Sequence, residues 1–100
     1  MRMRPSKFTV GGQDFTVNYK DECENLGSCC VWSGMITIAR NHKGEPQSES
    51  SMDNTFVHEL VHAILDTMGE DDLSQNEKFV STFASFLTEA VRTMDFNNIG

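Results

Sequence analysis

The sequence lacks any long hydrophobic run. No segment reaches the roughly 18 consecutive apolar residues that a membrane span requires. The basic start, residues 1–7, is not followed by the apolar stretch of a signal peptide. We therefore expect a cytoplasmic protein that has no membrane partner.

Basic residues are also scarce. Eight lysines and arginines stand against fifteen aspartates and glutamates, and the net charge is −7. The basic residues are scattered and form neither a run nor a basic helix face, so a surface that follows nucleic-acid phosphates is not expected. Cationic peptides suit this charge better.

The chain has only three cysteines, Cys23, Cys29 and Cys30, and no pair has the two-to-four-residue spacing of a zinc finger. An odd number of cysteines without an export signal favours reduced thiols. We expect Cys29 and Cys30 to begin a strand, one facing the core and the other solvent. A disulfide from Cys23 remains the alternative.

What the chain does contain is the composition of a small globular protein, with 38% hydrophobic and 23% charged residues among 100. We interpret residues 1–100 as one domain. A chain of this length buries roughly 60% of the surface that its unfolded form exposes, so a bound metal ion would add useful stability.

The N-terminal half has the pattern of short strands. Runs at 7–10 and 14–19 are separated by Gly11-Gly12, which predicts a hairpin. Residues 29–32 and 35–40 form either one bent strand or a second hairpin, and the polar segments 21–28 and 41–51 are expected to be loops.

The C-terminal half has helical periodicity. One helix is predicted at 53–68, with Asp53 as N-cap and Gly69 after its end, and another at 75–94, with Ser74 as N-cap. The fold class is then α+β: a small antiparallel N-terminal sheet packed on two helices. Aromatic residues are expected in the core, namely Tyr19, Trp32, Phe79, Phe83 and Phe86.

The first predicted helix contains the sequence His58-Glu59-Leu60-Val61-His62. Histidines four residues apart project from the same helix face and can bind one zinc ion, while Glu59 is placed to act as general base on a zinc-activated water. The plainer alternative is that both histidines are ordinary residues at the edge of the core.

A catalytic zinc site needs a third protein ligand, and Glu77 is the leading candidate. Ser74 and Glu77 also match a capping box, in which the carboxylate would bind a backbone amide instead. His42 and Asp66 are weaker candidates. The acidic run at 70–72 is the remaining alternative.

These residues resemble those of the gluzincins, metallopeptidases in which a glutamate on a later helix completes a His-Glu-x-x-His zinc site. The resemblance covers roughly residues 36–87, including Asn76-Glu77, and extends to small phage-encoded proteins described as metallopeptidases. It implies that Ser81 stands where the family often has a carboxylate that orients a histidine. Tyr19 and His42 are the candidates for the family's oxyanion-stabilising residue.

The sequence thus predicts a zinc-dependent metallopeptidase of the endopeptidase type, with His58, His62 and Glu77 as metal ligands and Glu59 as the catalytic base. A peptide or protein is the expected substrate, bound along the strand at 35–40. The alternatives are a non-catalytic zinc-stabilised binding or effector protein and a metal-free interaction module. Substrate specificity, oligomeric state and any need for an activating partner are not fixed by the sequence.

Overall fold

The sheet begins with a hairpin whose turn consists of two glycines. The computed structural model describes residues 4–96, and in it β1 (Lys7–Val10) and β2 (Gln13–Glu22) form an antiparallel hairpin with Phe8 opposite Phe15. Gly11 and Gly12 have φ angles of 57° and 83°, in the left-handed region that side chains disfavour. The predicted first hairpin is confirmed.

The remaining strands form a second hairpin and a short extension. β3 (Gly27–Cys30) pairs antiparallel with β4 (Met35–His42), and β5 (Glu45–Pro46) pairs with the end of β4. Of the two arrangements expected for 29–40, the hairpin is therefore correct. The predicted loop at 41–51 is wrong, because it contains β5 and the start of a helix.

The sheet is mixed, whereas the sequence predicts a purely antiparallel sheet. The strand order is β1-β2-β4-β3, and β2 runs parallel to β4. β4 is the most apolar strand, with Ile36, Ile38 and Ala39 fully buried, so it takes the central place while the chain passes through β3 at the edge. The prediction that a peptide binds along residues 35–40 is wrong, because β4 is already paired on both sides.

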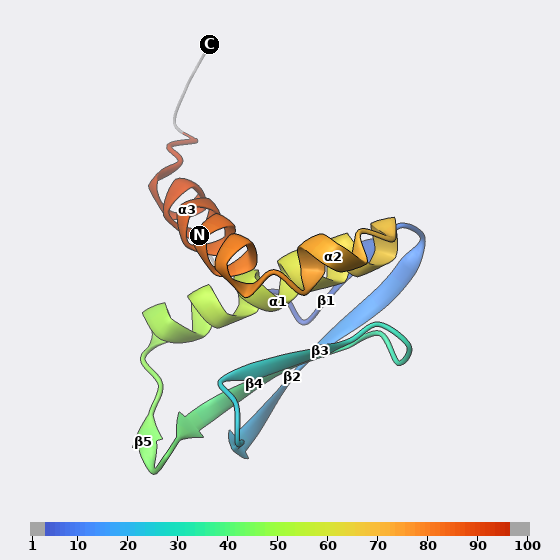
Figure 1. Cartoon of the computed structure of the whole chain (residues 1–100). Coiled ribbons are helices and arrows are strands. Elements are labelled where there is room, and N and C mark those ends of the chain that lie inside the picture. Colours follow the sequence, from blue (N-terminus) through green and yellow to red (C-terminus); the bar gives the residue numbers. More distant parts are fainter. Residues whose placement is uncertain (1–3, 97–100) are drawn as a thin grey trace.

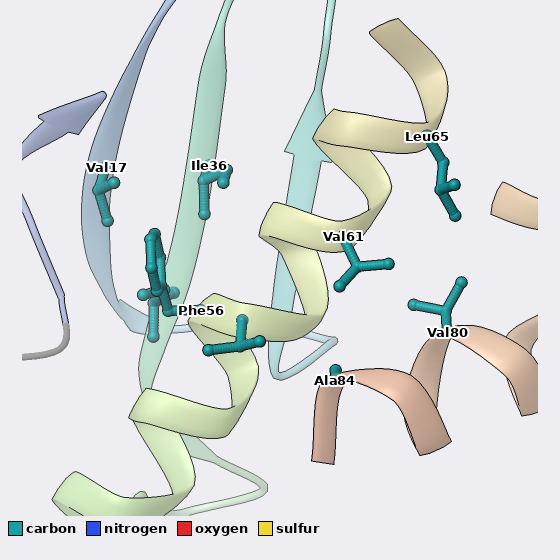
Figure 2. Close-up of a cluster of buried hydrophobic side chains, with 9 residues drawn as sticks. Val17, Ile36, Phe56, Val61, Leu65, Val80 and Ala84 are labelled. Carbon is teal, nitrogen blue, oxygen red and sulfur yellow. The ribbon is translucent and has the colours of Figure 1, made fainter. Parts of the chain in front are cut away.

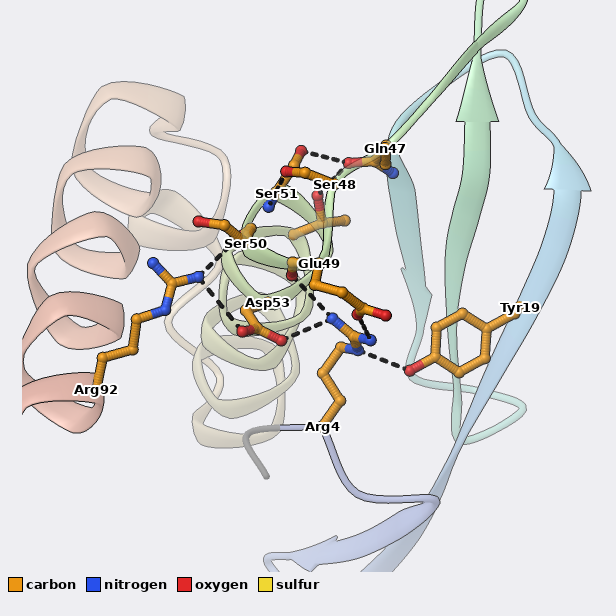
Figure 3. Close-up of polar contacts among 10 residues, drawn as sticks. Arg4, Tyr19, Gln47, Ser48, Glu49, Ser50, Ser51, Asp53 and Arg92 are labelled. Carbon is orange, nitrogen blue, oxygen red and sulfur yellow. Dashed lines mark hydrogen bonds and ion pairs between the residues drawn. The ribbon is translucent and has the colours of Figure 1, made fainter. Parts of the chain in front are cut away.

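Helix α1 (Glu49–Met68) begins one turn earlier than predicted. Its N-cap is Ser48, whose side chain accepts a hydrogen bond of 3.0 Å from the backbone N–H of Ser51. Asp53 therefore lies inside the helix, where its carboxylate pairs with Arg4 and Arg92 (Figure 3). The predicted end at Gly69 is confirmed, since Gly69 has a φ of 81°.

The second predicted helix is confirmed as α3, and a short helix that was not predicted precedes it. The short α2 (Asp71–Ser74) precedes α3 (Glu77–Thr93), whose N-cap is Asn76 with its side chain 3.1 Å from the backbone N–H of Phe79. The predicted cap, Ser74, is buried within α2 and does not cap α3. Asn76 is nearer to the helix start and takes this role.

The elements form three layers, with α1 between the sheet and α3 (Figure 1). Within residues 4–96, α3 contacts α1 and α2 but no strand, so the expectation that both helices pack on the sheet holds for α1 alone. The α+β class is confirmed. Figure 2 shows the core that joins the layers: Val17, Ile36, Ile38, Phe56, Val57, Val61, Leu65, Val80 and Ala84.

Most of the aromatic residues expected in the core are exposed. Trp32, in the β3–β4 turn, is 98% exposed, and Phe79, Phe83 and Phe86 on α3 are between 36% and 68% exposed. Their helix has only one packing partner layer, and it buries the face that carries Val80, Ala84 and Thr88 instead. Tyr19 is the exception, since it is half-buried against the core.

Cys29 and Cys30 stand at the end of β3 and not at the start of a strand, so that part of the expectation is wrong, but one faces the core and the other faces solvent. All three are free, Cys29 is half-buried against the core and Cys30 is exposed. Burial, followed by the charges of Glu59 and Asp66, raises the pKa of Cys29 to about 12.

None of the helices between residues 4 and 96 has both the length and the apolar composition of a membrane span.

Candidate metal centre

Helix α1 presents His58 and His62 together on the face that looks toward the start of α3. Residues four apart on an α-helix are neighbours, and the two imidazole rings have centroids 5.0 Å apart. Their side chains are 22% and 17% exposed, so both are accessible without being loose on the surface. The helix thus supplies two nitrogen donors at fixed spacing.

Glu77 reaches these histidines from the first turn of α3. Its Oε2 lies 3.2 Å from Nε2 of His58 and its Oε1 lies 3.2 Å from Nε2 of His62. The alternative of a capping box is wrong, because Ser74 does not cap α3 and the Glu77 carboxylate lies at the histidines. The reversal of the chain after Gly69 brings this carboxylate back over α1.

The geometry of the three side chains fits a small divalent ion. One donor atom from each of His58, His62 and Glu77 can be chosen so that all lie within 4.8 Å of one another. Two ligand atoms about 2.1 Å from a tetrahedral zinc are about 3.4 Å apart, close to the observed contacts of 3.2 Å. Two imidazoles and one carboxylate also form a known catalytic zinc donor set.

Ser74 contacts His62 at the ring nitrogen that does not face Glu77. Its hydroxyl lies 3.0 Å from Nδ1 of His62, and the residue is only 5% exposed. When Nδ1 donates to the hydroxyl, Nε2 keeps its lone pair on the side of Glu77, as a metal ligand requires. The position of Ser74 before a helical pattern predicts a helix cap, and no sequence signal distinguishes a capping serine from this one.

Ser81, the residue that the resemblance places near a histidine, has a different position. It is exposed and lines the cleft beside the cluster, and no hydrogen bond joins it to either histidine among residues 4–96. The role expected for Ser81 therefore belongs to Ser74 in this fold.

Glu59 lies beside the cluster without being part of it. The residue is 8% exposed, and burial together with the charge of Glu77 raises its pKa to about 7. Gly27 of β3 packs so closely here that a Cβ atom would lie 2.5 Å from Cγ2 of Thr55 and 3.4 Å from Cγ of Glu59. The absence of a side chain at Gly27 lets the edge strand approach this carboxylate.

The protonation of His58 is affected by its burial and by two neighbouring groups. Burial lowers the pKa of His58, an effect that the positive charge of His62 reinforces and the carboxylate of Glu77 opposes. A lowered pKa keeps the His58 imidazole neutral near physiological pH, which is the form that binds metals.

An open cleft of about 620 Å³ lies over these residues. His42 lines it, whereas Tyr19 is outside it and accepts a hydrogen bond of 2.9 Å from Arg4. Asp66 and the acidic run at 70–72 are absent from its wall and from the donor cluster. The lining residues are Asn25, Leu26, Gly27, His42, Asn54, Thr55, His58, Glu59, His62, Glu77 and Ser81.

Comparison with models of protein families, with curated proteins and with solved structures gave no match to this chain. The motif and the geometry of the cluster are therefore the basis on which a function is inferred.

Proposed function

We propose that this chain is a zinc-dependent metallopeptidase. The observation that carries the proposal is the convergence of His58, His62 and Glu77, whose donor atoms lie within 4.8 Å of one another beside the buried Glu59. A zinc ion bound by these three residues would supply a Lewis acid that polarises a peptide carbonyl and makes water a better nucleophile at neutral pH.

Glu59 is the general base in this proposal. Its carboxylate lines the cleft next to the donor cluster, and its pKa of about 7 is near the value at which a base both accepts and releases a proton efficiently. A cation on the adjacent histidines would favour the ionised form of Glu59, which is the form that accepts a proton.

We further propose that an extended peptide pairs with the edge strand β3. The Ala39 N–H donates a hydrogen bond of 2.9 Å to the Leu26 carbonyl, and antiparallel pairing alternates from residue to residue. By this alternation Gly27 and Cys29 direct their backbone N–H and C=O groups away from β4. Gly27 also lines the cleft, so a peptide on this edge would pass Glu59.

His42 is the proposed partner of the negative charge that develops on the carbonyl oxygen. Of the two residues that the resemblance suggests, it is the one in the cleft. Its Nδ1 is buried and has no hydrogen-bond partner among the described residues. Because Nδ1 is buried, the proposed donor to a substrate oxygen is the other ring nitrogen, Nε2.

The direct test is Glu59→Gln, assayed for zinc content by native mass spectrometry and for cleavage of a peptide library. We expect one zinc per chain in wild type and variant, and a loss of cleavage on the order of 100-fold or more in the variant. Glu89→Gln, which changes an exposed glutamate on α3, is the matched control and should keep both properties. Undiminished cleavage by zinc-loaded Glu59→Gln would rule out this mechanism.

The second candidate function is a non-catalytic zinc-stabilised binding protein, again in the cytoplasm. It is favoured by the position of Glu77, because a metal bound there would join the outer helix α3 to α1. This function predicts a wild type that binds zinc, melts at a lower temperature in chelator and cleaves no peptide in the library.

A further inference from the structure

The outward face of α3 carries a row of apolar side chains that the metal centre does not use. Phe79, Phe83, Phe86 and Ala90, here called the phenylalanine seam, are spaced by four, three and four residues, and all four are exposed. Phe79 and Phe83 stack with ring centroids 5.7 Å apart. A groove of about 410 Å³ lies along the three phenylalanines.

The spacing and size of the seam are those of a helix-packing surface. Alternating steps of four and three residues form the narrow stripe along which two helices interlock side chains. At the exposures observed, the three rings leave on the order of 300 Å² of apolar surface in water. A patch of this size is at the lower end of the range of the largest patches on monomeric proteins, which are often functional.

The charges of α3 favour a second copy of the chain as the occupant. The chain carries a net charge of −7, but α3 is neutral, because Glu77 and Glu89 are balanced by Lys78 and Arg92. Two α3 helices can therefore approach each other without the repulsion that the rest of the surface would cause.

Lys78 and Glu89 are also placed for a symmetric pair. Lys78 precedes Phe79 and Glu89 precedes Ala90, so both lie on the same side of the seam near its opposite ends. When two such helices meet in antiparallel orientation, each lysine faces the glutamate of the other copy. Neither residue forms an ion pair within residues 4–96.

We propose that the chain forms a homodimer through the phenylalanine seam. The two α3 helices pack antiparallel about a twofold axis near Phe83, and each ring fits between side chains of the second copy. Two identical contacts between Lys78 and Glu89 of the other copy fix the register. Glu77 lies on a different face of α3, at His58 and His62, so the cleft stays open in the dimer.

The test is sedimentation equilibrium of the full chain, with zinc and with chelator, over a range of concentrations. We expect concentration-dependent dimerisation, about 10-fold weaker in Lys78→Glu and in Glu89→Lys, because each single change places like charges together. The double variant exchanges the two charges and should recover most of the loss. Phe83→Glu should be monomeric with an unchanged circular dichroism spectrum.

Trp32→Ala is the control, since it removes an even more exposed aromatic ring from another surface and should dimerise like the wild type. A wild type that is monomeric at every attainable concentration would overturn the proposal and leave the seam to a different partner. Dimers that Phe83→Glu does not weaken would overturn it as well. Failure of the double variant to recover would overturn the antiparallel register.

Discussion

Helices α1 and α3 carry similar amounts of apolar sequence, but they are buried differently. α1 is covered by the sheet on one side and by α3 on the other, whereas α3 is covered on one side alone. The candidate metal centre lies where the two meet, with two donors from the enclosed helix and one from the outer helix. A metal bound at this centre would therefore connect α3, which is covered on one side alone, to the enclosed helix α1.

The largest expected effect is a difference in stability between two variants, each with one phenylalanine replaced by alanine, one on α1 and the other on α3. Phe56 on α1 is 4% exposed and Phe86 on α3 is 68% exposed. Phe56→Ala should lower the free energy of unfolding by about 3–5 kcal/mol, because it leaves a cavity in the core. Phe86→Ala should change it by less than about 0.5 kcal/mol for a dilute monomer.

Urea unfolding at low protein concentration, in chelator, measures both changes. Keeping the concentration low prevents self-association from adding to the stability of the wild type. Similar losses in the two variants would mean that α3 is as enclosed as α1, contrary to the layer order.

Removing the donor from the outer helix comes next in size. Glu77→Ala should lower zinc affinity on the order of 100-fold or more, since two histidines remain where three ligands stood. It should also remove most of the increase in melting temperature that we expect zinc to give the wild type. Competition with a chromophoric chelator measures the affinity. Glu89→Ala, on the same helix but away from the cluster, should bind zinc like the wild type.

A smaller effect concerns the enclosed carboxylate of Glu59 in metal-free protein. Its pKa in the folded chain, about 7, is above its ordinary value of 4.5, because burial and then Glu77 disfavour the charged form. The stability that protonated Glu59 contributes is complete below about pH 4.5 and is lost as the pH rises toward 7. We expect the loss, relative to Glu59→Gln, to be on the order of 2 kcal/mol.

Urea unfolding in chelator at pH 5 and pH 8 measures this difference. The pKa of His58 is lowered, mainly by burial, so this histidine contributes stability that increases with pH. That opposing contribution is present in both proteins and cancels when they are compared. Equal pH dependence in wild type and Glu59→Gln would contradict the raised pKa.

Local sequence signals predicted a large part of this structure. The Gly11-Gly12 turn, the end of α1 at Gly69 and the spacing of His58 and His62 each depend on neighbouring residues, and the structure has them as predicted. Features that depend on distant residues were predicted less well. The parallel pairing of β2 with β4 follows from competition for the centre of the sheet, which no local pattern encodes.

The phenylalanines of α3 illustrate the same limit. An apolar stripe at helical spacing predicts that the helix buries one face, but it does not reveal which face or against what. The smaller residues Val80 and Ala84 pack on α1, where they allow the close approach that brings Glu77 to the histidines. The larger rings remain outside. Size alone was a poor guide to burial.

The smallest expected effect distinguishes the two serines near the cluster. Ser74→Ala should lower zinc affinity about 10-fold, because the hydroxyl that holds Nδ1 of His62 is lost while every donor remains. Ser81→Ala should leave affinity unchanged, since Ser81 lines the cleft without bonding a histidine. Both variants are measured against the wild type with the same chromophoric chelator. A larger loss of zinc affinity in Ser81→Ala than in Ser74→Ala would mean that Ser81, the position that the family resemblance suggests, supports the histidines. The hydrogen bond between Ser74 on α2 and His62 would then have no part in holding the metal.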